Sequence, residues 1–494
     1  MTYEPRMKLR KHQQDYLELV RGKRLFALLA EMGVGKSAML LAEWAEREAE
    51  GRINDLLIIA PAGSYRNWEG ELLKHLAPDT FKRVFNYVWQ SGASSRGATE
   101  KKRLDTFLAC RSRPRIFVVN VEALSSAAGT KEACLAFLSV SGRRSMMAID
   151  ESTVVRNEKA IRTKVVMQLK AHADLRRILT GLVSPRSPLD LYTQFDFLDW
   201  RILGHESIVT FKRRYCVLES TLIPVGRDKD SKVKWRRIET IVAYRNLEEL
   251  QKKIEPYSYR VLKKDCLDLP PKIYLRREVE LTEQQKQLYN DLVLFSTAEL
   301  NAAAHVTTNM VITKLLRLHQ IVCGHVVDEE GKEHDVNSNR ISELMELLSD
   351  HSGKAIIWSN YRREIDKIVA ALEKEYGEGS VAQFHGGNNK TRLKDETRFL
   401  TDPACRFMIS TQSSGGSGNT WVNASLVVYF SNSYDLEMRM QSEDRCHRDG
   451  LKHSVTYVDL VAPRTVDEKI LKALRKKLDM TTLISGEAWR DWVV

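Results

Sequence analysis

The sequence lacks the features that mark secreted, metal-stabilised or membrane-spanning chains. Its seven cysteines are scattered singly over 494 residues, with no CxxC pair and no tight Cys/His cluster, which argues against a disulfide framework and against zinc. The opening MTYEPRMKLRKHQQ lacks the apolar stretch of a secretory signal, and no run approaches the ~18 apolar residues of a membrane helix. We therefore expect a soluble intracellular protein without a membrane partner, cytoplasmic in a bacterial or phage-infected cell and nuclear in a eukaryotic one.

The composition is that of an ordinary globular protein with an excess of basic residues. Hydrophobic residues make up 43% and charged residues 29% of the chain, values that exclude a disordered chain. At about 100 to 200 residues per domain, the length predicts two or three domains. The balance of 77 Lys+Arg against 65 Asp+Glu gives a net charge of +12, which favours a polyanionic partner, with nucleic acid first. Solubility alone would explain the same balance.

The strongest motif is a phosphate-binding loop in AEMGVGKS. The apolar run Leu25–Ala30 predicts a buried strand, and a helix is expected from about Lys36. Between them, Gly33 and Gly35 allow backbone N–H groups to face a phosphate, Lys36 can reach the β and γ phosphates, and the Ser37 hydroxyl can bind Mg²⁺. The first glycine of the usual GxxxxGK[ST] pattern is replaced by alanine.

A pair of acidic residues supplies the second half of a predicted ATPase. The apolar run from Met146 to Ile149 is followed directly by Asp150 and Glu151. Phosphoanhydride hydrolysis needs one carboxylate near Mg²⁺ and another that positions water. We therefore expect Asp150 to join Ser37 at the metal and both acids to be catalytic.

Strands that alternate with helices predict a parallel sheet in each half of the chain. In the first half, Asp55–Ala60 is followed by PAGSYRNWEGEL, at the sheet edge where ligands bind. We expect a first domain over 1–200, a mostly helical basic insertion over 201–340 and a second α/β domain over 341–494. The strands expected in the last domain are Lys354–Trp358, Val381–Phe384, Phe407–Ser410 and Leu426–Phe430.

Two arginines in QSEDRCHRDG have the spacing of a helical face. Arg445 and Arg448 lie three residues apart, so on a helix both can point into one cleft. Two arginines aimed at a phosphate are what arginine-finger chemistry requires. A solvated surface pair is the alternative.

Several stretches, in the same order, resemble the Swi/Snf branch of superfamily 2 helicases and DNA translocases. AEMGVGKS is similar to the family's AEMGLGKT, RRILTGLVSPRSPLDLY to RxxLTGTPxxNxxxDLY, and QSEDRCHRDG to QxxxRxxRxGQ, and an LPPK turn is shared. Leu182 and Val183 replace the Thr-Pro pair of the second motif, and Leu451 replaces the last glutamine of the third. The resemblance spans nearly the whole chain and implies two RecA-like domains with a helical insertion between them.

The resemblance also implies ATP and Mg²⁺ as cofactors and assigns roles to individual residues. It assigns Mg²⁺ binding to Asp150, the activation of water to Glu151, and the recognition of adenine to Gln13 in LRKHQ, with Arg10 as its neighbour. It adds Gly418, from GGSGN, and Gln441 to the nucleotide-binding set. The residues expected at DNA are Pro61, Ser64, Asn67, Thr180 and Gly181, joined by the basic residues Lys212, Arg213 and Arg214. For Trp68 we favour core packing over DNA contact.

The function that follows is a DNA-dependent ATPase that moves along or remodels double-stranded or branched DNA and acts as a monomer. Fork remodelling, branch migration and annealing are all compatible with it. Two alternatives stay open: a strand-separating DNA or RNA helicase, and a nucleic-acid-binding scaffold whose motor is degraded.

Overall fold

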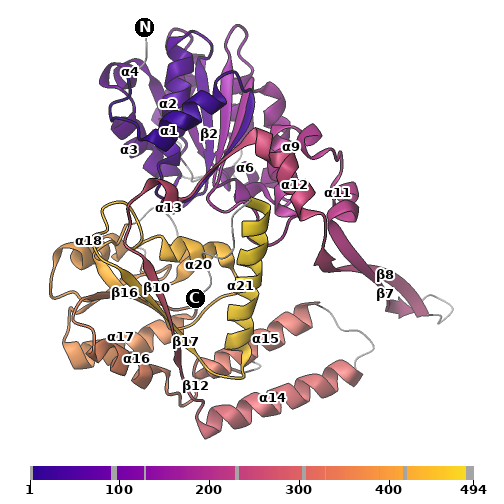
Figure 1. The fold of residues 1–494 in the computed structure, drawn as a ribbon, viewed down its shortest axis with the longest axis vertical. Coiled ribbons are helices and arrows are strands. Elements are labelled where there is room, and N and C mark those ends of the chain that lie inside the picture. The colour runs from indigo at the N-terminus through magenta and orange to yellow at the C-terminus, as the bar shows by residue number, and fades with distance from the viewer. Residues whose placement is uncertain are drawn as a thin grey trace. The chain divides into compact units, whose positions relative to one another are not determined.

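The computed structural model describes most of the chain as two compact units (Figure 1). The described residues are 4–90, 97–126, 129–227, 233–302, 308–328, 330–388, 390–415 and 420–485. Unit 1 comprises Met1–Tyr215, Tyr244–Asp268 and Asp479–Asp491, and unit 2 comprises Cys216–Ala243, Leu269–Leu478 and Trp492–Val494. Within the described ranges, no helix has both the length and the apolarity that crossing a bilayer requires.

Unit 1 is built on a seven-stranded sheet in the order β3-β4-β2-β5-β6-β1-β9, and every neighbouring pair is parallel. Most of its strands are continuous apolar runs because helices cover both faces of a parallel sheet. The strands are β1 (Leu25–Ala30), β2 (Asp55–Ala60), β3 (Phe85–Val88), β4 (Arg115–Asn120), β5 (Ser145–Asp150), β6 (Leu175–Leu179) and β9 (Ser258–Val261). The helices of eight or more residues are α1 (Lys11–Val20), α2 (Lys36–Ala49), α3 (Trp68–His75), α5 (Ala98–Ala109), α7 (Thr130–Leu138), α8 (Ile161–Leu169), α9 (Asp190–Leu198), α11 (Ile208–Tyr215) and α12 (Leu247–Ile254).

A buried ion cluster fixes α1 and α2 against this sheet. Glu43 of α2 accepts hydrogen bonds from Arg177 of β6, from Arg47 at 2.9 Å and from the Tyr16 hydroxyl of α1 at 2.7 Å. The Glu43 and Arg177 side chains are only 2% and 0% exposed. Because a buried charge is costly unless it is paired, this cluster sets the position of α2 and hence of the loop that precedes it.

Unit 2 contains a second parallel sheet, in the order β10-β17-β16-β13-β15-β14. The prediction of an α/β fold with two parallel sheets is confirmed. The strands are β10 (Lys272–Glu278), β13 (Lys354–Trp358), β14 (Val381–Phe384), β15 (Phe407–Ser410), β16 (Ala424–Tyr429) and β17 (Val455–Val461). The helices of eight or more residues are α14 (Glu283–Ala302), α15 (Thr308–Val322), α16 (Arg340–Ser349), α17 (Arg362–Tyr376), α18 (Arg392–Thr401), α20 (Leu436–Glu443) and α21 (Val466–Ser485).

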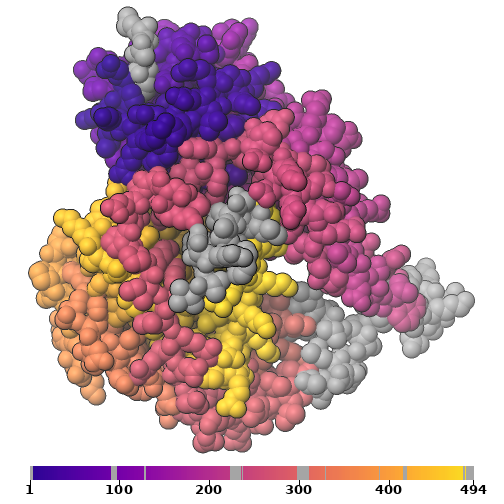
Figure 2. All heavy atoms as spheres, viewed as in Figure 1, coloured from indigo at the N-terminus to yellow at the C-terminus, as the bar shows by residue number. Residues whose placement is uncertain are grey.

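The segment 201–340 differs from the mostly helical insertion that we expected. Its strands β7 (Cys216–Arg227) and β8 (Val233–Tyr244), labelled in Figure 1 and coloured magenta in Figure 2, pair as a two-stranded sheet. Short β9 completes the first sheet, and β10 forms the edge of the second, well before the expected start at 341. These strands were missed because β9 has only four residues and because charged residues interrupt the exposed strand β10.

Helix α21 contributes to both units. It begins at Val466 among the residues of unit 2, and from Asp479 onward its residues belong to unit 1. Ile484, in its last turn, is fully buried in the hydrophobic core of unit 1. The Thr481 hydroxyl donates a hydrogen bond to the Ser184 carbonyl oxygen at 2.8 Å. The core of unit 1 therefore includes residues from near the end of the chain.

Candidate nucleotide and nucleic-acid site

The phosphate-binding loop connects the end of β1 to the start of α2 at Lys36. Gly33 and Gly35 have φ values of +83° and +92°, a left-handed conformation that side chains rarely tolerate. A Cβ atom added to Gly35 would lie 2.4 Å from Nε2 of Gln13. The loop is therefore tight and closely covered by α1, and its geometry fits a phosphate cradle at a helix N-terminus.

The first turn of α1 covers this loop with two polar side chains. His12 Nε2 lies 2.9 Å from the Val34 carbonyl oxygen, and the Gln13 amide donates to the same oxygen at 3.4 Å. Gln13 Oε1 accepts the backbone N–H of Arg10 at 2.9 Å. The structure thus brings the predicted Gln13 to the loop, whereas the Arg10 side chain is exposed. The sequence analysis missed His12.

Lys36 links the loop to the predicted catalytic acids. Its Nζ donates to the Ala30 carbonyl oxygen at 3.2 Å and lies 3.2 Å from Glu151 Oε1. Glu151 follows β5 with φ +44°, a left-handed value for a non-glycine residue. Such strained residues cluster at functional sites.

Asp150, at the end of β5, carries an unusual carboxylate. Desolvation and the neighbouring charge of Glu151 raise its pKa to about 7, although Lys36 and the indole of Trp68 favour the charged form. Mg²⁺ prefers oxygen ligands, and it is commonly bound by one or two carboxylates together with the phosphates of the substrate. The Ser37 hydroxyl and Asp150 fit such an ion by their chemistry, and Lys36 fits the phosphates.

Two residues of α3 contact the predicted metal ligands. Trp68 is only 2% exposed, in line with core packing, yet its indole N–H donates to Asp150 Oδ2 at 3.2 Å. Glu71 is hydrogen-bonded to the Ser37 side chain. The sequence analysis missed Glu71, although its spacing of three residues from Trp68 places both on one helix face.

The predicted DNA residues of the loop before α3 lie at the end of β2. Pro61 and Ser64 are partly exposed, and Asn67 is exposed. The Ala62 backbone N–H donates to Glu122 Oε2 at 2.9 Å, which ties the loop to the end of β4. These residues are accessible to a ligand, and their contact with DNA stays a prediction.

Thr180 and Gly181 lie instead against the phosphate loop. Thr180 is 0% exposed, and its hydroxyl donates to the Leu182 carbonyl oxygen at 3.0 Å. A Cβ atom on Gly181 would lie 3.3 Å from the Met32 backbone nitrogen. The prediction that Thr180 contacts DNA needs correction, because its side chain is buried where a duplex cannot reach it.

The basic residues of α11 differ in their surroundings. Arg214 forms an ion pair with Glu249 of α12, and this bond lowers the pKa of Glu249 to about 2. Arg213 is exposed, and Lys212 is half-buried. Because the charge of Arg214 is already matched, Lys212 and Arg213 are the better candidates for phosphate contacts.

The predicted arginine pair lies in a turn rather than on a helix. Helix α20 ends at Glu443, and Arg445 and Arg448 follow it. The Arg445 carbonyl oxygen accepts the Trp421 N–H at 2.8 Å, so it does not serve a helical N–H. Arg445 is 1% exposed, whereas the half-buried Arg448 donates to the Asp444 carbonyl oxygen at 2.8 Å and to the Thr420 hydroxyl at 3.1 Å. The expectation of one shared helical face is therefore wrong.

Comparison with known proteins places the chain in a family. The family model of the SNF2-related domain matches residues 17–326, more than half of the chain, and the helicase conserved C-terminal domain matches 339–450. The chain belongs to the SNF2-related family. Gln441 of this SNF2-related protein lies on α20, whereas Gly418 lies outside the described residues.

Relatives of this SNF2-related chain include bacterial and eukaryotic proteins. YwqA of Bacillus subtilis (strain 168), an ATP-dependent helicase/translocase by name, is 24% identical over 97% of this chain and 49% of its own length. TATA-binding protein-associated factor MOT1 of Saccharomyces cerevisiae is 25% identical over 97% of this chain and 27% of its own length. The Sulfolobus solfataricus SWI2/SNF2 ATPase core in complex with dsDNA aligns over 100% of this chain and 97% of that chain, with 24% identity and a TM-score of 0.42. The chain spans about half the length, or less, of these curated relatives.

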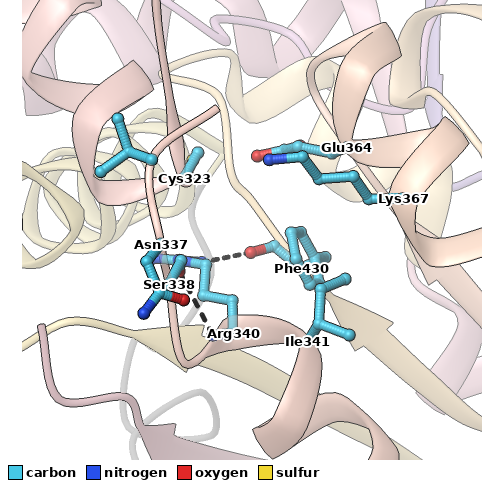
Figure 3. A pocket seen from close by; sticks show the side chains of 9 residues that line it. Cys323, Asn337, Ser338, Arg340, Ile341, Glu364, Lys367 and Phe430 are labelled. Carbon is cyan, nitrogen blue, oxygen red and sulfur yellow. Dashed lines mark hydrogen bonds between the residues drawn. The ribbon is translucent and has the colours of Figure 1, made fainter. Parts of the chain in front are cut away.

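Unit 2 of the SNF2-related chain also encloses a cavity of ≈ 170 Å³ (Figure 3). Arg340 donates to the Phe430 carbonyl oxygen and pairs with Asp467. Glu364 accepts hydrogen bonds from serine hydroxyls, and Lys367 donates to the Gly324 carbonyl oxygen at 2.8 Å. The lining residues of this cavity include none of the predicted nucleotide or DNA residues.

Proposed function

We propose that the chain is an ATP-dependent double-stranded DNA translocase of the Swi/Snf type, a DNA-dependent ATPase that requires Mg²⁺. One observation carries the proposal: Lys36 Nζ lies 3.2 Å from Glu151 Oε1, beside a phosphate loop of two left-handed glycines. A cation for phosphate and a carboxylate for water thus lie within reach of one phosphoanhydride. The helicase/translocase name of YwqA agrees with this reading.

Each residue of the candidate site in unit 1 has one role in the proposed reaction. Ser37 and Asp150 hold Mg²⁺, and Lys36 binds the β and γ phosphates. When bound, the ion neutralises phosphate charge and orients the terminal phosphoryl group. Glu151 orients the attacking water and accepts its proton. Gln13, which bonds the Val34 carbonyl oxygen of the loop, binds the adenine of ATP. The donor set of oxygens fits Mg²⁺ better than a softer metal.

Double-stranded DNA is the proposed polyanion. The net charge of +12 supports a phosphate-rich partner. Pro61, Ser64 and Asn67 at the end of β2, together with Lys212 and Arg213, supply accessible polar and basic groups. We propose that a single copy of the chain suffices for this activity.

The test is the rate of ATP hydrolysis with single-stranded DNA, duplex DNA, forked DNA and RNA. We expect slow turnover of the protein alone and strong stimulation by duplex DNA. Equal stimulation by RNA would contradict a duplex translocase. Release of a labelled strand from a fork during hydrolysis would instead identify a strand-separating helicase, and an absence of hydrolysis with every nucleic acid would identify a scaffold.

A further inference from the structure

We propose that Trp68 and Glu71 of α3 are positioning residues for the two protein ligands of Mg²⁺, and that they carry the effect of DNA at the preceding loop to the metal site. The inference rests on the proposed function, since it assigns Ser37 and Asp150 to the metal. It concerns two residues that do not themselves touch ATP.

Trp68 fixes one of the two ligands. Its indole N–H donates to Asp150 Oδ2 at 3.2 Å, while the Glu151 backbone N–H donates to Oδ1 at 3.0 Å. Both carboxylate oxygens are thereby oriented by a donor, and each keeps lone pairs for a metal or its water. Because Trp68 is 2% exposed, its ring has little freedom to turn away.

Glu71 fixes the other ligand. Its carboxylate is hydrogen-bonded to Ser37 and lies 3.3 Å from His75 Nε2, one turn further along α3. A serine hydroxyl that donates its hydrogen bond to a carboxylate keeps its oxygen lone pairs for a cation. Residues that orient metal ligands in this way commonly contribute 10- to 100-fold to metal affinity.

The same helix begins at the predicted DNA loop. Asn67, exposed and expected at DNA, immediately precedes Trp68, and the short helix Tyr65–Asn67 leads directly into α3. A ligand that shifts Asn67 must shift the first turn of α3, which carries both positioning residues. The helix packs against α2, which begins with Lys36 and Ser37. Loop, helix and metal ligands thus form one continuous path within unit 1.

The experiment measures how binding of a fluorescent, non-hydrolysable ATP analogue to the full chain depends on Mg²⁺. The variants are Trp68→Phe, which keeps a ring but removes the N–H, and Glu71→Gln, which keeps the size but removes the charge. We expect the half-saturating Mg²⁺ concentration to rise about tenfold or more in each, with analogue binding in EDTA unchanged. The matched control is Glu69→Gln, an exposed acid on the same helix, which should leave the Mg²⁺ requirement unchanged.

The outcomes separate positioning from coupling and from the function itself. An unchanged Mg²⁺ requirement in Glu71→Gln would overturn the positioning role. Because the Glu71 side chain is half-exposed, an increase in this variant is not explained by misfolding. Duplex DNA should lower the Mg²⁺ requirement of the wild type and do so less in Trp68→Phe, at equal duplex affinity. A wild-type requirement that ignores duplex would overturn the coupling. Failure of DNA-stimulated hydrolysis would remove the proposed function but would leave the DNA-free Mg²⁺ measurement decisive for positioning.

Discussion

Two desolvated carboxylates, one in each unit, have opposite electrostatic surroundings. Asp150 in unit 1 receives an indole and a backbone N–H, stands next to Glu151, and has its pKa raised to about 7. Glu443 in unit 2 is bonded by Lys272 at 2.9 Å, by Arg439 at 2.9 Å and by the Tyr274 hydroxyl at 2.7 Å. Burial raises the pKa of Glu443, but Lys272 and Arg439 outweigh it and lower the pKa to about 2.

The difference fits the metal-binding role proposed for Asp150 and a structural role for Glu443. Glu443 has its full complement of cationic partners within its own unit, so its charge is already compensated. Asp150 lies next to the charge of Glu151, which Lys36 and the hydrogen bonds from Trp68 and the Glu151 backbone offset only in part. A perturbed carboxylate of this kind is typical of a site that receives a cation. Substitutions at the two sites should therefore have opposite consequences.

The largest effect is expected for Lys36→Ala. The lysine is the cation of the phosphate loop, so its loss should abolish ATP turnover, while duplex affinity stays near the wild-type value. Turnover is measured with saturating duplex DNA, and affinity by fluorescence anisotropy of labelled duplex. An equal loss of DNA affinity would show that the nucleotide and DNA sites are not separate.

Glu443→Gln should destabilise unit 2. Removal of one partner from a buried charge cluster costs about 3–5 kcal/mol, because Lys272 and Arg439 lose the carboxylate that both of them bond, although Arg439 keeps its ion pair with Asp459. Since the folded-state pKa of Glu443 is depressed, the wild-type protein should lose this stabilisation as the pH falls from the usual carboxyl range towards 2. Urea unfolding between pH 3 and 7 measures both effects. A variant as stable as the wild type at neutral pH would contradict the structural role.

Arg448→Ala should lower DNA-stimulated hydrolysis at least a hundredfold, on the order of 3 kcal/mol of barrier. The residue is the predicted arginine finger, and its half-buried side chain can be removed without opening the core. Arg448→Lys should fail too, because a point charge does not replace the planar fork. The buried Arg445 provides the comparison, since Arg445→Ala should also lower Tm. Near-normal turnover of Arg448→Ala with DNA bound would exclude the finger role.

Asp150→Asn should raise thermal stability at alkaline pH. In the wild type the folded state keeps a proton on Asp150 up to about pH 7, so folding stability falls as the pH rises from about 4 through that value. The asparagine variant does not carry this charge, and its Tm should exceed the wild-type Tm by a few degrees at pH 8 and match it near pH 4. ATP turnover of the variant should be lost at both pH values. Equal Tm values at pH 8 would contradict the raised pKa.

The smallest effect concerns the basic residues of α11. Neutralising Lys212 or Arg213 should flatten the log-log salt dependence of duplex binding by ~0.9 for each true phosphate contact. Arg214→Gln serves as the matched control, because Arg214 is already paired with Glu249 and should leave the slope unchanged. If the slope is unchanged in all three variants, Lys212, Arg213 and Arg214 are ordinary solvated surface residues.

The sequence predicted the central strands and the loop closely, for a definite physical reason. The strands at Leu25–Ala30, Asp55–Ala60 and Lys354–Trp358 begin and end as expected, because a strand buried on both faces is a continuous apolar run bounded by turns. The edge strands β9 and β10 were missed, because β9 has only four residues and charged residues interrupt the exposed β10. Because these strands were missed, the expected domain boundaries differ from those of the two units.

Contacts across the fold were beyond what the sequence could predict. The bond from Trp68 to Asp150 joins residues 82 positions apart, and it depends on how α3 packs within unit 1. The placement of Arg445 in a turn depends likewise on the Trp421 N–H that occupies its carbonyl oxygen. Local periodicity contains no information about either partner.

The contribution of α21 to unit 1 has a consequence for how the protein emerges from the ribosome. The first sheet lacks its edge strand until β9 has been synthesised, and its core lacks Ile484 until α21 has been synthesised. At ~5–20 residues per second, synthesis from β1 to Ile484 takes roughly half a minute to a minute and a half. Unit 1 therefore cannot complete its folding before α21 is made, and during this interval part of its apolar surface is open to chaperones.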